Sequence, residues 1–447
     1  MSKNTPPLIT QQLARIGAWG TALIIVLLPF HAFLTAWGAT VFGSYDLLRS
    51  WKEALLLVGL LLAIGIVVTD KTQRWKQLLK QTPMLWVLGY ACLTLIFSLI
   101  TLWGESVTRD ALLYGLMIQL RFMCFFGLVA VFSLYDDLIF RRWQRLLLGP
   151  AVVVVIFGLL QIFILPSDFL TQFGYGPDTI PAFQTIDNKL EFQRIQSTLR
   201  GANPYGAYLV LIITALVTRM YARRRNYWSW AFLLAATVNL YFTYSRSAWV
   251  GLLLSLAVLS FLFARHRITK SMVLVGVTLC VVAVSGIWLL RDNDYVQNTL
   301  FHSDETSISE QSSNQQRGQA LASSFEDIVL EPLGGGVGSA GPASFRNQPA
   351  VPRVAENYFI QTGQEMGWLG LAGIVAVMVA VGRWLYRQRN SRLATVLLAS
   401  LIGLTFINFV SHAWADDVIS LLWWGLAGAL MGHGILNKEQ TKSKKEV

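Results

Sequence analysis

Long apolar runs separated by short polar segments occupy most of this chain. Many windows approach or exceed the ~20 apolar residues that a helix needs to cross a ~30 Å hydrocarbon core. The pattern predicts twelve membrane-spanning helices, near residues 16–36, 53–69, 83–101, 112–133, 147–165, 203–218, 228–243, 248–263, 271–290, 357–381, 393–410 and 418–435.

Composition supports this prediction. Apolar residues make up 54% of the 447 positions and charged residues only 14%, too few for a soluble surface. We therefore expect an all-α polytopic membrane protein. The three cysteines, Cys92, Cys124 and Cys280, lie inside apolar runs at unrelated spacings, which indicates packing thiols and neither a disulfide framework nor a metal site.

Basic residues are concentrated in every second connection. Because Lys and Arg stay on the cytoplasmic side, both termini are expected there. The net charge of +11 mostly reflects this bias, so nucleic acid is not an expected partner. The polar stretch Met1–Arg15 lacks a small-residue cleavage site, and the first span is expected to be retained. The basic segments are Lys71–Lys80, Arg141–Arg145, Arg219–Arg225, Arg265–Lys270, Arg383–Arg392 and Lys438–Lys445.

The longest polar interval divides the chain. We expect a nine-helix membrane region at 1–290, a large extracytoplasmic loop at 291–356, three more spans at 357–435 and a basic cytoplasmic tail at 436–447. Within the loop, apolar residues at helical spacing predict an amphipathic helix over Gln315–Leu330 at the membrane interface. The glycine-rich run Gly334–Gly338 lacks the Lys-Ser/Thr of a phosphate-binding loop and indicates a tight turn.

Four arginines are expected on the outer face despite the charge bias, together with one carboxylate, Glu356. They are Arg200, Arg246, Arg291 and Arg317. Guanidinium groups keep their charge and donate bidentate hydrogen bonds to phosphates, which at a membrane edge belong to lipids or lipid-linked diphosphates. Glu356 could act as the general base for an attacking hydroxyl, and a diphosphate leaving group would be stabilised by the arginines. This chemistry can proceed without a metal or cofactor.

Each of these residues also has a structural interpretation. Arg200 could belong to the start of the helix that Asn203-Pro204 would begin. Arg246 and Arg291 could be helix-end charges that reach the interface. Arg317 could lie on a solvated helix face, and Glu356 could interact with a helix dipole. Arg121, in the middle of a span, needs a partner or a cavity, so an ion pair and a substrate role remain open. The weaker candidates are His31, Glu365, Asn408, His412, Asp416 and Asp417.

Several short motifs follow one another on the expected outer face. They are Arg200-Gly201-Ala202-Asn203-Pro204, Ser245-Arg246-Ser247-Ala248-Trp249 with Gly251, Arg317 followed by Glu331-Pro332-Leu333-Gly334 and Gly336-Val337-Gly338, and Glu356-Asn357-Tyr358 with Glu365-Met366-Gly367. This ordered set, over roughly Gln196 to Gly370, resembles the bacterial O-antigen ligase and O-antigen polymerase family. Ligases of this family typically carry a histidine just before the asparagine, where this chain has Glu356.

The resemblance implies a metal-independent, inverting glycosyltransferase of the bacterial inner membrane. Its expected partners are an undecaprenyl-diphosphate-linked glycan donor, a saccharide or lipid-glycan acceptor, and membrane lipids. Polymerase and ligase activity remain alternatives. A flippase of lipid-linked sugars would place polar residues throughout the membrane depth, and a non-catalytic assembly partner would tolerate loss of the arginines. The expected catalytic residues are Glu356, Arg246 and Arg200, and the expected substrate-binding residues are Arg317, Asn203, Asn357, Tyr358, Arg121 and Arg291.

Overall fold

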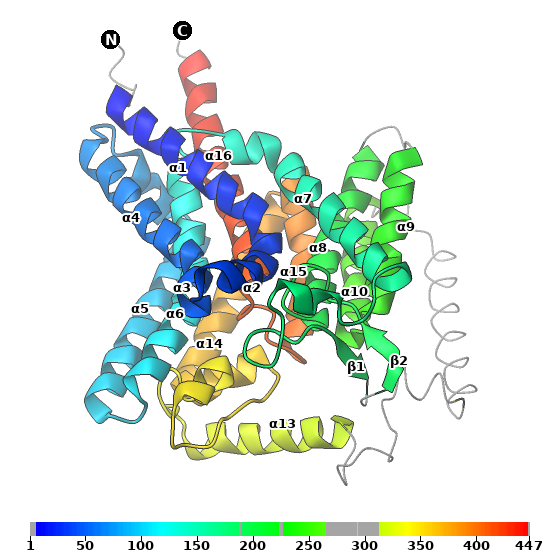
Figure 1. Ribbon diagram of the computed structural model, residues 1–447. Coiled ribbons are helices and arrows are strands. Elements are labelled where there is room, and N and C mark those ends of the chain that lie inside the picture. The colour runs from blue at the N-terminus through cyan, green and yellow to red at the C-terminus, as the bar shows by residue number, and fades with distance from the viewer. Residues whose placement is uncertain (1–5, 187–188, 223–226, 265–292, 294–312, 446–447) are drawn as a thin grey trace.

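The computed structural model describes residues 6–186, 189–222, 227–264, 293 and 313–445, and these residues are mostly helical (Figure 1). Two short antiparallel strands form the sheet found in this part of the chain. The elements are α1 (Leu8–Leu27), η1 (Leu28–Phe30), α2 (His31–Phe42), α3 (Tyr45–Arg49), α4 (Trp51–Thr69), η2 (Arg74–Lys80), α5 (Thr82–Gly104), α6 (Arg109–Phe132), α7 (Leu138–Phe163), η3 (Phe169–Phe173), β1 (Gln184–Ile186), β2 (Lys189–Arg194), α8 (Ala202–Ala222), α9 (Tyr227–Phe242), α10 (Arg246–Ala264), α13 (Ser313–Leu330), η5 (Gly341–Arg346), α14 (Tyr358–Arg387), α15 (Arg392–Asn408) and α16 (Asp417–Lys445).

The predicted class, an all-α polytopic membrane protein, is confirmed. In the described part of the chain, nine helical segments are long and apolar enough to cross a membrane, and α15 is a shorter apolar helix. The expected span at 228–243 corresponds to α9, a helix of 16 residues. The expected span at 271–290 lies outside the described residues. The number of twelve spans is therefore not confirmed. The helix α16 also continues past the expected boundary at residue 435 as far as Lys445.

The helix expected near the membrane interface is present as α13. Figure 1 shows α13 at the end of the molecule opposite the start of α1 and the end of α16. One face of α13 is anchored by Ile328, which is buried, whereas Phe325 and Val329 are more than half exposed. Exposed apolar side chains on a helix at this end are typical of a helix that lies on a lipid surface.

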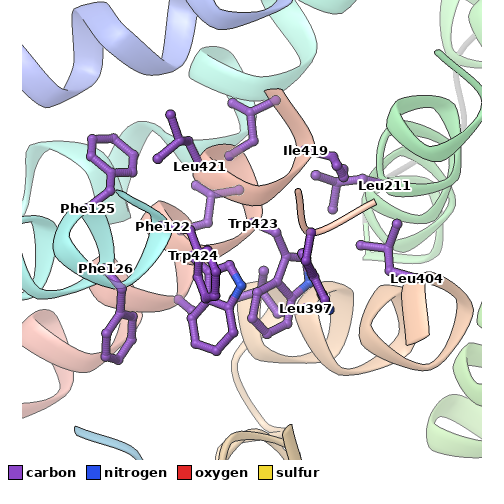
Figure 2. Packing of buried hydrophobic residues seen from close by; sticks show 14 of the residues in the cluster. Phe122, Phe125, Phe126, Leu211, Leu397, Leu404, Ile419, Leu421, Trp423 and Trp424 are labelled. Carbon is purple, nitrogen blue, oxygen red and sulfur yellow. The ribbon is translucent and has the colours of Figure 1, made fainter. Parts of the chain in front are cut away.

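The core of the bundle is the contact between α6 and α16 (Figure 2). In Figure 2, Trp423 and Trp424 of α16 lie close to Phe122 of α6, and all three side chains are fully buried. Glycines of α16 allow this approach, since a Cβ atom at Gly428 would lie 2.4 Å from the carbonyl oxygen of Phe126. Small residues at such crossings let two membrane helices pack with their backbones close together.

A break divides α14 into two helical halves. Gly367 has φ +60° and ψ −158°, outside the helical region. The segment between α13 and η5 contacts the backbone there: the amide of Gly336 donates to the carbonyl of Glu365 at 3.1 Å, and the amide of Trp368 donates to the carbonyl of Pro332 at 3.1 Å. Helix breaks within a membrane are tolerated where other protein groups satisfy the freed backbone. The glycine-rich run therefore forms a turn and also hydrogen-bonds to the break in α14.

Candidate functional site

The turn at residues 409–416, between α15 and α16, connects three of the predicted site residues. Asn357 donates through Nδ2 to the carbonyl of Phe409 at 2.9 Å. Arg121 donates to the carbonyl of Ala415. Arg200 forms an ion pair with Asp416, with 3.4 Å between Nε and Oδ2. Segments that are far apart in the sequence therefore converge on one short turn.

Asp416 uses its two carboxylate oxygens differently. Oδ1 accepts the backbone amides of Val418 at 3.0 Å and Ile419 at 3.3 Å, which caps the start of α16. Oδ2 faces Arg200. The Asp416 side chain is only 4% exposed, whereas the Arg200 side chain is 44% exposed. A fixed, buried carboxylate therefore orients a guanidinium group that remains accessible to a ligand.

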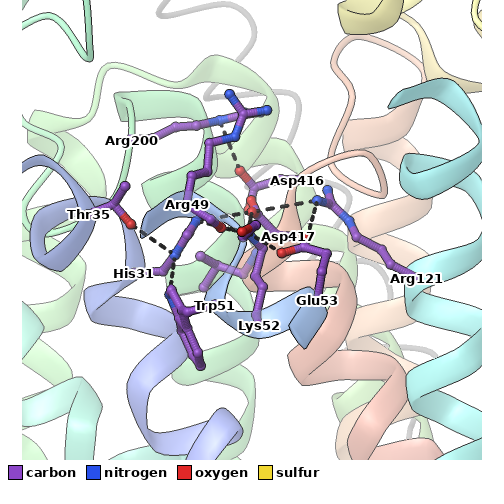
Figure 3. A network of polar contacts seen from close by, with 12 residues as sticks. His31, Thr35, Arg49, Trp51, Lys52, Glu53, Arg121, Arg200, Asp416 and Asp417 are labelled. Carbon is purple, nitrogen blue, oxygen red and sulfur yellow. Dashed lines mark hydrogen bonds and ion pairs between the residues drawn. The ribbon is translucent and has the colours of Figure 1, made fainter. Parts of the chain in front are cut away.

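The neighbouring Asp417 is the centre of a buried charged network, drawn in Figure 3. Its Oδ2 lies 2.9 Å from Nζ of Lys52, 3.3 Å from Nε2 of His31 and 3.6 Å from Nη1 of Arg121. Glu53 adds a second carboxylate, 3.3 Å from Lys52 Nζ. Buried charges require such partners because their desolvation is costly. Of the two interpretations of Arg121, the structure provides the ion pair, and its predicted substrate role remains untested.

Sequence reasoning did not select Lys52 and Glu53 as site residues and gave Asp416 and Asp417 little weight. A signal was nevertheless present, because two adjacent charges at the beginning of the span at 53–69 are costly in a membrane without partners. What the sequence could not provide was the pairing, since Lys52 and Asp417 come from opposite ends of the chain.

His412, in the same turn, has a ring nitrogen, Nε2, that is buried and has no hydrogen-bond partner among the described residues. Burial, followed by the nearby positive charge of Arg200, lowers the pKa of His412 to about 4. The imidazole is therefore neutral near pH 7. Its free nitrogen can donate or accept a hydrogen bond, depending on the tautomer.

The motif at the start of α14 has a clear structural role. Glu356 has a positive φ of +47°, and Asn357 follows as the N-cap residue. Asn357 Oδ1 accepts the amides of Phe359 at 2.9 Å and Ile360 at 3.0 Å. Tyr358 is fully buried and donates to Gln119 Oε1 at 3.1 Å. Asn357 and Tyr358 thus engage their polar atoms within the protein, and their substrate-binding roles stay predictions.

Glu365 is a second buried carboxylate, held by neutral donors. Gln119 Nε2 donates to its Oε2 at 2.8 Å, and the amide of Gly338 donates to its Oε1 at 3.2 Å. Gln119 therefore links Tyr358 of α14 to Glu365 on the same helix. These contacts join α6, α14 and the glycine-rich segment into one unit.

The remaining predicted residues are only partly described. Arg246 is the first residue of α10 and half-buried. Asn203 accepts a hydrogen bond from Arg194 Nη2 at 2.6 Å, an arginine that sequence analysis did not select. Arg317 lies on α13, but its side chain is outside the described set, as is the whole of Arg291. The convergence of Arg246 and Arg317 with Arg200 stays a prediction.

The fold and this turn define a polytopic helical membrane protein that carries an oriented, accessible arginine beside buried charges. Residues 230–375, about a third of the chain, match the family model described as O-antigen ligase. The match confirms the resemblance to the O-antigen ligase family found in the motifs, although the Arg200 motif lies outside the matched residues. It indicates a glycosyltransferase of the O-antigen ligase type in the bacterial inner membrane. No curated protein matches the chain significantly.

Proposed function

We propose that this protein transfers a glycan from an undecaprenyl-diphosphate carrier to an acceptor hydroxyl on the extracytoplasmic face of the membrane. The observation that carries the proposal is the shared turn at 409–416. It holds Arg200 through Asp416 and also contacts Asn357, the residue that follows Glu356. The candidate diphosphate-binding motif and the candidate base motif are therefore anchored to the same short segment.

In the proposed reaction, Arg200, Arg246 and Arg317 bind the diphosphate. The acceptor oxygen attacks the anomeric carbon of the donor sugar and a new glycosidic bond forms. The bond between that carbon and the diphosphate oxygen breaks, and its electron pair leaves with undecaprenyl diphosphate. Glu356 takes the proton of the hydroxyl as the attack proceeds. The guanidinium groups stabilise the charge that develops on the leaving group, so the step requires no metal ion.

The orientation of the chain is part of this proposal. With both termini in the cytoplasm, the loop that contains α13 faces outward. A cysteine at the exposed Ala350 should then react with an impermeant thiol reagent in intact cells, in a background without native cysteines. A cysteine at the exposed Gln388 should be protected. The reverse labelling would place the site in the cytoplasm and exclude an outward-facing transfer.

Arg246→Lys tests the catalytic proposal. The purified full chain would be assayed with an undecaprenyl-diphosphate-linked glycan and its acceptor fraction. An ammonium group cannot replace the bidentate guanidinium contact, so we expect Arg246→Lys to lose most transfer activity while its amount in the membrane is unchanged. Arg219→Lys, in the last turn of α8, is the matched control and should keep full activity. Full activity in both variants would exclude diphosphate binding by Arg246.

A further inference from the structure

Two arginines outside the predicted site share one tyrosine. The guanidinium carbon of Arg49, at the end of α3, lies 5.0 Å from the ring centroid of Tyr114 on α6. The guanidinium carbon of Arg346, at the end of η5, lies 4.3 Å from the same centroid. Arg49 also donates a hydrogen bond to the Tyr114 hydroxyl. One aromatic ring thus holds two cations from segments that are far apart in sequence.

Tyr114 carries no charge that could neutralise either cation. In the described part of the chain, Arg49 and Arg346 form no ion pair with a carboxylate, and their contacts are with Tyr114. A cation beside an aromatic face is stabilised by the ring, which orients the group without neutralising its charge. Arg346 is exposed and Arg49 is partly exposed, so an anion from the solvent can reach both.

The arrangement is fixed before any ligand binds. Thr108 Oγ1 donates to the carbonyl of Arg346 at 2.9 Å, and the Thr108 amide donates to Asn347 Oδ1 at 2.9 Å. Thr108 is also the N-cap residue of α6, the helix that carries Tyr114. The outer loop is therefore attached at the point where its arginine meets the ring.

This pair of arginines is continuous with the proposed diphosphate site. Arg49 and Arg200 line the same small cavity, together with Tyr45 and Asp416. Figure 3 shows Arg49 beside Asp416 and Arg200. Figure 1 shows α3 and α6 on one side of the molecule and α10, which begins at Arg246, on the other. The helices that carry Arg49 and Tyr114 therefore lie on the side of the molecule away from α10.

We propose that Arg49, Tyr114 and Arg346 bind a phosphate or carboxylate group on the saccharide acceptor. This inference rests on the proposed function, in which Arg200 and Arg246 hold the donor diphosphate. An acceptor must then approach from the side that the donor leaves open, and its anionic group would meet two preorganised guanidinium groups. The cluster would select acidic acceptors over neutral ones, whereas the chemistry at the hydroxyl would remain unchanged.

Ligand-detected NMR on the full chain in phosphatidylcholine nanodiscs tests the inference, with glucose 6-phosphate and glucuronate as probes and glucose as the neutral control. We expect both acidic sugars to bind and glucose not to bind. In the Arg49→Gln/Arg346→Gln variant, the affinity for the acidic sugars should fall at least about tenfold, because the charge-assisted hydrogen bonds to both guanidinium groups are lost. Arg109→Gln, an exposed arginine near the same loop, should bind as wild type.

Three outcomes would overturn the inference. The first is equal binding of glucose and glucose 6-phosphate, and the second is unchanged affinity in the double variant. The third is an effect of that variant only on the enrichment of phosphatidylglycerol over phosphatidylcholine around the protein, measured in a second set of nanodiscs that contain both lipids. The last result would assign the cluster to lipid headgroups. Arg346→Gln alone, at an exposed position, keeps the test valid if Arg49→Gln impairs folding. Because the readout requires neither donor nor turnover, it is independent of the Arg246→Lys assay of the proposed function.

Discussion

Asp416 and Arg200 are joined through one oxygen of a carboxylate whose other oxygen caps a helix. Oδ2 of Asp416 lies 3.4 Å from Nε of Arg200, while Oδ1 receives the amides of Val418 and Ile419. The arginine is thus tied to the first turn of α16, the helix that forms the core of the bundle with α6. The position of a candidate substrate-binding group is set by the most buried part of the fold.

Substitution at Asp416 can separate the two roles of this carboxylate. Asn is as good an N-cap residue as Asp, so Asp416→Asn should keep the helix start but remove the charge that orients Arg200. We expect the apparent KM for the lipid-linked donor to rise several-fold with near-normal thermal stability. Asp416→Ala should in addition lose about 0.5–2 kcal/mol of stability. An unchanged KM for the donor in Asp416→Asn would show that Asp416 only caps the start of α16 and does not orient Arg200 for donor binding.

The Lys52–Asp417 pair should contribute strongly to stability when one partner is removed. Lys52 is about 1% exposed and its ammonium group lies 2.9 Å from Asp417 Oδ2. Lys52→Met should destabilise the protein by about 3–5 kcal/mol, because it leaves buried negative charge with fewer partners. Adding Asp417→Asn should restore part of this loss, as thermal unfolding in detergent can measure.

A surface pair provides the control for that experiment. Asp137 and Arg141 form an ion pair at 2.5 Å, but the Arg141 side chain is 74% exposed. Exposed pairs contribute ~0–1 kcal/mol, so Asp137→Asn should change the unfolding temperature little. Equal losses of stability in Lys52→Met and Asp137→Asn would show that burial does not determine how much an ion pair contributes to stability.

His412 should make the stability of the protein depend on pH. Its folded-state pKa of about 4 lies below the ordinary value of 6.5, so between these values the unfolded chain binds a proton that the folded protein excludes. The stabilising contribution is complete above about pH 6.5 and is lost as the pH falls towards 4. As the pH is lowered over this range, the unfolding temperature of His412→Asn should therefore fall less steeply than that of the wild type. Parallel pH profiles of the two proteins would show that His412 is not the group responsible.

Glu356→Gln tests the proposed base. Gln keeps the size and hydrogen-bonding capacity but cannot take a proton, so kcat should fall by roughly 10²–10⁴-fold at saturating donor. Donor binding, which we assign to arginines, should change little. The structural alternative, an interaction of Glu356 with the helix dipole, is worth only ~0.3–1 kcal/mol and predicts nearly normal turnover. Single-turnover assays of the two proteins distinguish these cases.

Hydrophobic runs were sufficient to predict the all-α polytopic class, and apolar residues at helical spacing predicted α13. Burial in lipid imposes length and periodicity directly on the sequence. The break in α14 was not predicted. Gly367 lies in an apolar run, and its conformation becomes necessary only because Pro332, just before the glycine-rich segment, occupies the adjacent space. The Pro332 carbonyl oxygen is 2.0 Å from where a Cβ would lie.

Only part of the site could be predicted, because contacts between segments that are far apart in the sequence leave no local pattern. Arg200 could be selected because an arginine on the expected outer face needs an explanation. Its partner Asp416 is more than two hundred positions away, and no local pattern connects them. The same is true of Arg49 and Arg346, which become neighbours only through Tyr114. Sequence shows which charges are costly, whereas their pairing depends on tertiary contacts.

The break in α14 also has a consequence for the order of events during synthesis. The glycine-rich segment leaves the ribosome before α14, yet its amides donate to carbonyls of Gln364 and Glu365 within that helix. The segment therefore cannot reach its final hydrogen-bonded state until the next span has been inserted. Insertion of α14 is thus expected to fix the glycine-rich segment in place, so a chain truncated before residue 358 would enter the membrane with this segment lacking these hydrogen bonds.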